Sequence, residues 1–193
     1  TTIPRASAIL GAARTLAAKL LLAVPIDRAA LSQAMTESAG GRDAAGAWQQ
    51  RDSFEALEVA LSLAIPELVS RMDVGAAIAT LEALAKELPT HTVRSEDQIQ
   101  FQQFSTPPAL ARLAVHLARL SSDDVVLEPS AGTGIIASLA KGAAKDLILN
   151  ELEATRADLL EAVFPGTKVY RHDGAKLSAL LSGTERPSAV LMN

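Results

Sequence analysis

The sequence predicts an α/β protein in which a bundle of helices precedes a parallel β-sheet. Apolar residues recur at helical spacing from Ser7 to Leu88, whereas beyond residue 105 apolar runs of strand length alternate with helical stretches. Alternating strands and helices are typical of a parallel sheet, which binds ligands at the carboxyl ends of its strands. We therefore predict two domains, a helical bundle over 1–93 and a sheet domain over 94–193.

The N-terminal half is predicted to hold four helices. Local sequence signals suggest where they begin and end: the first stops before Pro25, Asp27 caps the second, Asp43 starts a third that Pro66 bends or breaks, and Asp73 caps a fourth that closes at Pro89. Apolar stripes usually form a core, so packing into a bundle is favoured over a partner-binding helical arm.

The C-terminal half is predicted to hold four strands separated by helices. A polar stretch over 90–105 is the expected linker, and Thr106 with Pro107 suits the N-cap and first position of a helix. Beyond it the expected strands are 124–128, 145–150, 167–171 and 188–193, with helices at 134–140, 153–163 and 175–181.

Composition excludes several classes of function. With 49% apolar and 21% charged residues, the chain of 193 residues is typical of a globular protein. It has no cysteine, which excludes disulfides and thiol nucleophiles and suits a reducing cytoplasm, where we expect the protein. The three histidines lack metal-ligand spacing, so no metal is expected, and no apolar run is long enough to span a membrane. A net charge of −4 is not that of a self-sufficient nucleic-acid binder.

A glycine turn follows the first expected strand. The segment 128–134 reads EPSAGTG, and its two glycines allow a sharp turn and close approach of a ligand to a helix N-terminus. With Ala137 it also satisfies the dinucleotide pattern G-x-G-x-x-A, so glycine spacing alone does not select the cofactor. Glu128 distinguishes between possible cofactors better than the glycine spacing does, because a carboxylate there would repel a diphosphate and attract an ammonium group.

Acidic residues also follow the second and third strands. Glu151 is placed to accept hydrogen bonds from ribose hydroxyls, and Asp173 to accept one from an adenine amine. Each also has a structural interpretation: Glu151 as a charge favoured by a helix dipole, and Asp173 as part of an Asp-Gly turn. Together with Glu128, these two residues predict a cofactor that combines a nucleoside with a positively charged group.

These segments resemble the S-adenosylmethionine-binding motifs of class I methyltransferases. More narrowly, FQQFSTP at 101–107 resembles the F-x-T-P element of DNA amino-methyltransferases, which methylate an exocyclic amine, usually adenine N6. VLMN at 190–193 supplies the first residue of their Asn-Pro-Pro-aromatic motif. With the helical leader and LPTHT at 88–92, the chain resembles the methylase part of bacterial strawberry-notch-like methylase–helicase fusion proteins.

The resemblance implies a Rossmann-like methyltransferase domain, present as its first half, with S-adenosylmethionine as cofactor. Asn193 would be the catalytic residue, accepting a hydrogen bond from the target amine and so raising the electron density on its nitrogen. The residues that would bind the cofactor are Phe104 and Thr106 (methionine carboxylate), Glu128 (ammonium), Pro129, Ala131, Gly132 and Gly134 (glycine motif), Glu151 (ribose), Leu152 (adenine ring), and Asp173 with Gly174 (adenine amine).

The implied partner is nucleic acid, DNA rather than RNA, with no membrane. The two prolines and the aromatic residue expected after Asn193 are missing, as is a basic target-recognition domain, so we expect this chain to be inactive alone. The fourth strand would leave an open sheet edge, so we also expect a homodimer through that edge or through the helical arm.

Two other functions are compatible with the sequence. A nicotinamide-dependent oxidoreductase is permitted by the glycine spacing and Glu151, but it is opposed by Glu128 and by Asn193 at the end of the fourth strand. A non-catalytic helical adaptor, whose second half is only a binding module, is the other. Binding of S-adenosylmethionine, of NAD or of neither would separate these three.

Overall fold

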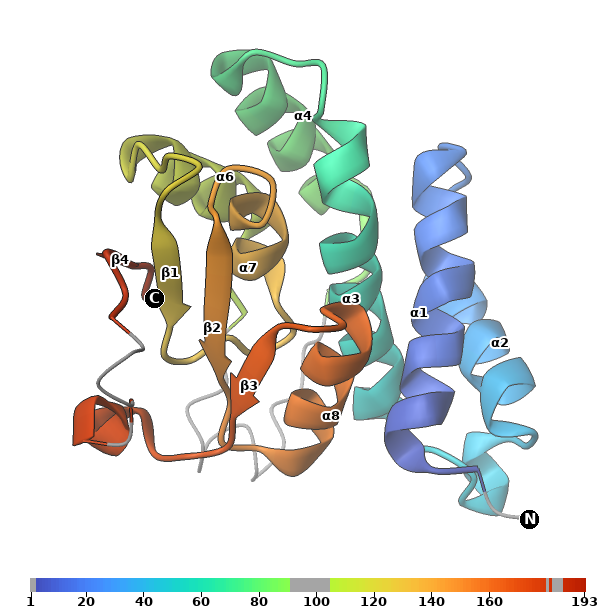
Figure 1. The fold of residues 1–193 in the computed structure, drawn as a ribbon. Helices are drawn as coiled ribbons and strands as arrows, with labels where there is room; N and C mark the ends of the chain where they lie inside the picture. The colour runs from blue at the N-terminus through green and yellow to red at the C-terminus, as the bar shows by residue number, and fades with distance from the viewer. Residues whose placement is uncertain (1–2, 91–104, 180, 182–185) are drawn as a thin grey trace.

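The computed structural model describes residues 3–90, 105–179, 181 and 186–193 (Figure 1). Helices occupy the N-terminal half, and strands alternate with helices after it. The elements are α1 (Arg5–Leu21), α2 (Arg28–Ala39), the 3-10 helix η1 (Asp43–Ala45), α3 (Gln50–Leu68), α4 (Val74–Glu87), α6 (Pro108–Leu117), β1 (Val125–Glu128), α7 (Ile135–Ala140), β2 (Asp146–Asn150), α8 (Ala154–Val163), β3 (Lys168–Tyr170), the 3-10 helix η2 (Gly174–Ala179) and β4 (Ala189–Val190).

These strands form one parallel sheet in the order β3-β2-β1-β4. Val126 pairs with Leu147 of β2 on one side and with Ala189 of β4 on the other. This order is that of the first four strands of a Rossmann-like sheet, in which the chain returns to the centre after its third strand. The predicted α/β fold class is therefore confirmed.

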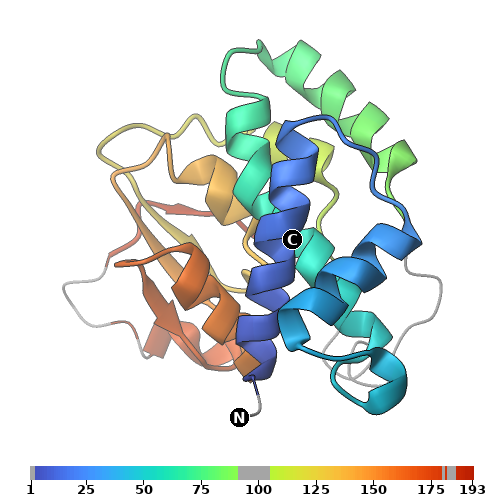
Figure 2. The ribbon, with the colours of Figure 1, turned by 90° about the vertical axis from the view of Figure 1, so that its right-hand side faces the viewer.

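The sheet separates a large core from a small one. Successive strand residues point to opposite faces, so Val126 and Leu149 join the large core while Leu127 and Ile148 join a small cluster with Leu177 of η2. The large core continues from the sheet through α7 and α8 into the N-terminal helices, because α3 packs on α7 and α1 packs on α8. Figure 2 shows α1 and α2 on the side away from the sheet. The predicted domain boundary falls outside the described residues and stays a prediction.

Local capping signals in the helical half are confirmed at two sites. The Asp27 side chain accepts a hydrogen bond from the Ala30 N–H at 2.8 Å and caps α2, and Asp73 caps α4 by accepting one from the Ala76 N–H at 2.9 Å. Within the described residues, no helix combines the length and the apolar character that a bilayer span requires.

The start predicted for the third helix is wrong. Asp43 begins only the 3-10 helix η1, which ends at Gly46 with a φ of 74°. The long helix α3 begins after Gln49, whose side chain forms a reciprocal capping box with Asp52. The box satisfies two backbone N–H groups, which explains why α3 starts there. Pro66 does not break α3, which continues to Leu68.

One expectation in the second half is also wrong. Thr106 is not an N-cap: α6 begins at Pro108, because that proline disfavours helical geometry in Pro107, whose ψ is 134°. The helical stretch predicted over 175–181 is found as the 3-10 helix η2, in which the Lys176 N–H bonds to the Asp173 carbonyl three residues before it.

Candidate functional site

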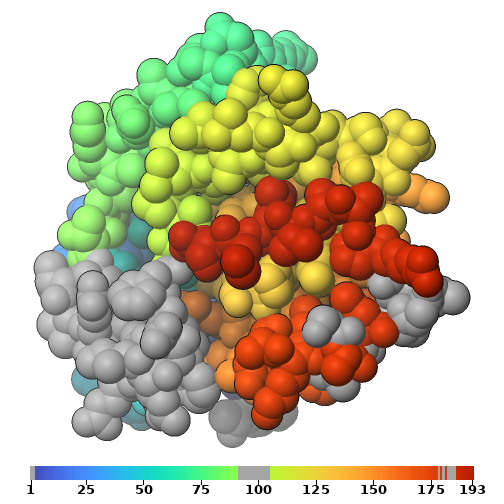
Figure 3. All heavy atoms as spheres, turned by 90° about the vertical axis from the view of Figure 1, so that its left-hand side faces the viewer, coloured from blue at the N-terminus to red at the C-terminus, as the bar shows by residue number. Residues whose placement is uncertain are grey.

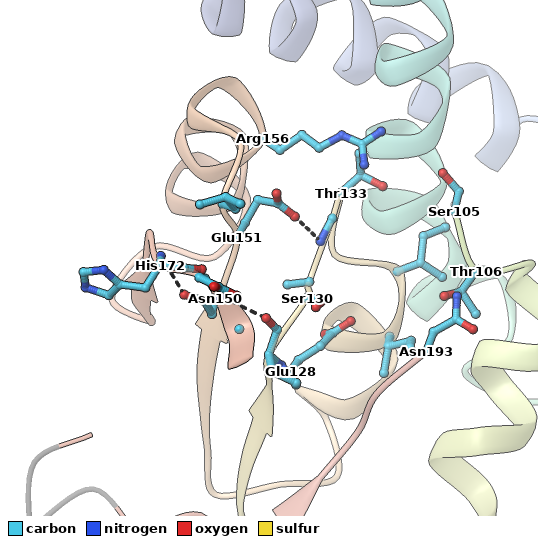
Figure 4. A pocket seen from close by; sticks show the side chains of 18 residues that line it. Ser105, Thr106, Glu128, Ser130, Thr133, Asn150, Glu151, Arg156, His172 and Asn193 are labelled. Atoms are coloured by element: carbon cyan, nitrogen blue, oxygen red, sulfur yellow. Dashed lines mark hydrogen bonds between the residues drawn. The ribbon is translucent and has the colours of Figure 1, made fainter. Parts of the chain in front are cut away.

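A cavity of about 670 Å³ lies at the carboxyl ends of the strands, within the size range of small-ligand sites (Figure 4). Figure 3 shows the C-terminal segment that includes β4 running between α6 and η2, at the β4 edge of the sheet. Of the residues predicted from the sequence, those that line the cavity are Thr106, Glu128, Pro129, Ala131, Gly132, Glu151, Leu152, Asp173, Gly174 and Asn193. Phe104 lies outside the described residues.

The glycine turn wraps one wall of the cavity. Gly132 and Gly134 have φ values of 56° and 87°, which glycine tolerates better than other residues. Gly134 is not among the cavity-lining residues: a Cβ there would lie 2.5 Å from Cε2 of Phe164 in the core. Gly132 therefore faces the cavity, whereas Gly134 packs the start of α7 against α8.

Glu128 ends β1 and is 4% exposed. The backbone N–H of Ala137, in the first turn of α7, donates to its carboxyl group. Among the described residues, nothing donates a hydrogen bond to its buried Oε2 atom, and the residue itself lines the cavity. Burial raises the pKa of Glu128 well above its ordinary value, and the charge of Glu151 raises it further. A buried acceptor without a donor costs stability, so it is a candidate for ligand recognition.

Glu151 holds the glycine turn from the end of β2. Its Oε2 atom accepts a hydrogen bond from the Gly132 N–H at 2.9 Å (Figure 4), and its Oε1 atom accepts one from the Glu153 N–H at 2.8 Å. Each carboxylate oxygen can accept a second bond, so Glu151 can brace the turn and still receive a ligand hydroxyl. The bracing was not predicted from the sequence.

Asn150 is a further residue that sequence reasoning missed, although it adjoins Glu151. Its Nδ2 atom donates to the carbonyls of Pro129 and His172, both at 2.9 Å, and its Oδ1 atom accepts from the His172 N–H at 3.0 Å. The side chain is buried and ties together the ends of β1, β2 and β3. Its position at a strand end was visible in the sequence, but its partners were not.

Asp173 and Leu152 lie at more open positions of the cavity. Asp173 is 53% exposed; it accepts a hydrogen bond from the Ala175 N–H at 3.1 Å, and Lys176 Nζ lies 3.9 Å from its other oxygen. The bond to Ala175 is the one expected if Asp173 forms an Asp-Gly turn, and the exposure places its side chain at the open edge of the cavity. Leu152 is half exposed and presents an apolar surface to the cavity.

Arg156 of α8 is a buried cation that sequence reasoning also missed. Its Nε atom lies 3.1 Å from Oε1 of Glu55, and an Nη atom lies 3.8 Å from Oε2 of Glu58, both on α3. No sequence signal relates Arg156 to α3, because about a hundred residues separate them. Arg156 is the one Lys or Arg among the described cavity-lining residues, which include three acids, Glu128, Glu151 and Asp173.

No protein-family model and no curated protein matches this sequence. Among solved structures, the chain is similar to the crystal structure of a protein from Pyrococcus horikoshii that is provisionally described as an RNA methyltransferase. The two chains are 23% identical with a TM-score of 0.45, and the match covers 61% of this chain. This chain spans 59% of the length of that structure. The Rossmann-like assignment rests on the strand order of this chain itself.

Proposed function

We propose that the cavity binds S-adenosylmethionine and that the chain is the cofactor-binding part of a nucleic-acid methyltransferase. The observation that carries the proposal is that Glu128 lines the cavity while its buried Oε2 atom has no hydrogen-bond donor in the described part of the chain. An ammonium group offers up to three N–H donors and a compensating charge, which suits such an oxygen.

The ionisation of Glu128 is part of this proposal. Burial raises its pKa, so without a cation beside it the carboxyl group keeps its proton up to a higher pH than an exposed glutamate does. An ammonium group at hydrogen-bond distance would favour the ionised form and lower that pKa. We therefore propose that Glu128 loses its proton and pairs with the ammonium group of the cofactor when the cofactor binds.

The remaining roles follow the arrangement of the cavity. We propose that Glu151 accepts from the ribose, that Leu152 covers the adenine ring and that Asp173 accepts from the adenine amine, with Thr106 at the methionine carboxylate. The cofactor, when bound, supplies an already activated methyl group. These residues would then contribute chiefly by holding the reactants in position.

For the methyl acceptor we propose an exocyclic amine, adenine N6 in DNA. Asn193 lines the same cavity as Glu128 and Thr106 (Figure 4), which supports a role in which its carboxamide oxygen accepts a hydrogen bond from an amine brought to the cavity. The choice of adenine and of DNA rests on the resemblance of segments 101–107 and 190–193. The inactivity of this chain alone, its dimerisation and its cytoplasmic location stay predictions.

The decisive experiment is calorimetric titration of the chain with S-adenosylmethionine and, separately, with NAD. We expect binding heat for S-adenosylmethionine alone. Glu128→Gln should weaken that binding by about 10- to 150-fold, because a charge-assisted hydrogen bond contributes about 1.5–3 kcal/mol. Glu161→Gln is the matched control, since that exposed residue pairs with Arg171 away from the cavity. Heat for NAD alone would support the oxidoreductase, and no heat for either compound would overturn the proposal.

The acceptor is tested by titrating adenosine and cytidine into the chain saturated with S-adenosylmethionine. The side-chain amide resonance of Asn193 reports proximity of the nucleoside. We expect adenosine to shift it and cytidine to leave it in place. A shift with cytidine alone would replace adenine by cytosine as the proposed target.

A further inference from the structure

The glycine turn at residues 132–134 is held from two opposite sides. On the β2–α8 side, the Gly132 N–H donates to Glu151. Glu151 also accepts from the Glu153 N–H, and Glu153 in turn caps α8 by accepting from the Arg156 N–H at 2.8 Å. The start of α8 and the glycine turn are thus joined by consecutive hydrogen bonds.

On the other side, the turn is held by α3 of the N-terminal half. Ser62 Oγ donates to the Thr133 carbonyl at 2.9 Å, and this contact is buried. Thr133 Oγ1 lies 3.4 Å from Oε2 of Glu58, and Ser105 Oγ donates to Oε1 of the same glutamate. Glu58 therefore contacts both the glycine turn and the chain that leads into α6.

Arg156 joins these two sides. It leaves α8, passes Gly132 and reaches α3, with Nη1 lying 3.8 Å from where a Cβ on Gly132 would be. There it pairs with Glu55 and Glu58. The side chain is only 4% exposed, so water does little to screen these interactions.

We infer that Arg156 is a positioning residue for the proposed cofactor site: by bridging Glu55 and Glu58 of α3 to the Glu151-bound glycine turn, it sets the backbone position that the cofactor would contact. This inference rests on the proposed function. It makes α3 a structural part of the site, so the N-terminal helices act on the cofactor through Arg156.

The charge balance makes Arg156 hard to replace. Two carboxylates of α3 face one guanidinium, and within the described residues Oε2 of Glu55 accepts no hydrogen bond. A planar guanidinium can interact with both carboxylates through different N–H groups, whereas the ammonium group of a lysine is a single point charge. Removing the guanidinium would leave the buried Glu55 carboxylate without its hydrogen-bonded cation, which is strongly destabilising.

The test uses Arg156→Met and Arg156→Lys, with Arg171→Met as the control because Arg171 pairs with Asp158 and Glu161 on the surface. One readout is the amide hydrogen exchange of Gly132 without added ligand, relative to the amides of β1 and β2. The other is the dissociation constant for S-adenosylmethionine. For Arg156→Met we expect both the relative exchange rate of Gly132 and the dissociation constant to rise at least tenfold. Arg156→Lys should give values between those of Arg156→Met and the wild type, and the Arg171→Met control should stay within twofold of the wild type.

Because Arg156→Met can fail to fold, Glu58→Gln provides a second arm. It removes one charge from α3; its single amide oxygen can accept from one of Thr133 and Ser105, and its NH2 group can donate to the hydroxyl oxygen of the other. We expect roughly threefold changes in the same direction. The inference is overturned if the exchange rate of the Gly132 amide, relative to the amides of β1 and β2, is the same in the folded variants as in the wild type. If the wild type binds no S-adenosylmethionine, the proposed function fails, yet the exchange measurement still decides whether Arg156 positions the turn.

Discussion

Replacing Gly134 by alanine tests whether the glycine turn is required by packing as well as by backbone conformation. The φ of Gly134 is 87°, and its N–H bonds to the Ala131 carbonyl at 2.8 Å. An added Cβ would lie 2.5 Å from Cε2 and 3.0 Å from Cζ of Phe164, and 3.0 Å from Cδ2 of Leu160. Phe164 and Leu160 are both buried in the large core, so neither can move aside without disturbing it.

The expected change in stability combines two costs and one smaller gain. A left-handed conformation costs a non-glycine residue roughly 1–2 kcal/mol. Overpacking against the aromatic ring adds about 1–3 kcal/mol, and the reduced entropy of the unfolded chain returns about 0.4–1 kcal/mol. Gly134→Ala should therefore lower the free energy of unfolding by about 1–5 kcal/mol, with a central expectation of about 3 kcal/mol. That central value corresponds to a Tm decrease of roughly 6–12 °C for a chain of this size.

Thermal and urea unfolding followed by circular dichroism would measure this loss, and Gly166→Ala is the matched control. Gly166 also has a positive φ, of 84°, but a Cβ there would meet nothing within 4 Å. It should cost only about 1 kcal/mol. The difference between the two variants isolates the contact with Phe164. Equal losses in both would refute the packing argument and leave backbone conformation as the whole requirement.

Three further predictions concern stability. Glu128→Gln should unfold at a higher urea concentration than the wild type near neutral pH. The raised pKa of Glu128 means that wild-type stability falls as the pH rises from the ordinary glutamate pKa of 4.5 through the raised pKa, and glutamine does not titrate; the same pH dependence of stability in the variant as in the wild type would contradict this. Asn150→Leu should cost about 3 kcal/mol in urea unfolding, because three partly buried backbone groups lose their partner. A loss below about 1 kcal/mol would mean that water replaces the lost amide. Asp73→Ala should cost about 0.5–2 kcal/mol in thermal unfolding through loss of the α4 cap, and no Tm change would mean that the cap is dispensable.

Glu128 combines two properties that a structural residue would not. Its burial raises its pKa and so costs stability, and one of its oxygens lacks a donor within the described residues. Replacing it should therefore stabilise the protein while weakening binding of S-adenosylmethionine. That opposition between stability and binding is typical of groups retained for a ligand, and it is open to measurement with a single variant.

Several features of this protein could be predicted from its sequence because they depend on neighbouring residues. Asp27 and Asp73 cap helices through bonds to N–H groups three residues away. The alternation of strands and helices predicted a parallel sheet, and a parallel sheet gathers its strand ends at one edge. For that reason Glu128, Glu151 and Asp173, which are far apart in sequence, could be expected around one cavity.

Other features were decided only by the tertiary structure. The partners of Asn150 lie on two other strand ends, Gly134 is required by the ring of Phe164, and Arg156 meets carboxylates on a helix about a hundred residues earlier. Contacts of this kind depend on how whole helices and strands pack, which sets the separation of side chains to a few tenths of an ångström. Periodicity predicts which face of an element is buried, but it carries no information about which distant side chain that face will meet.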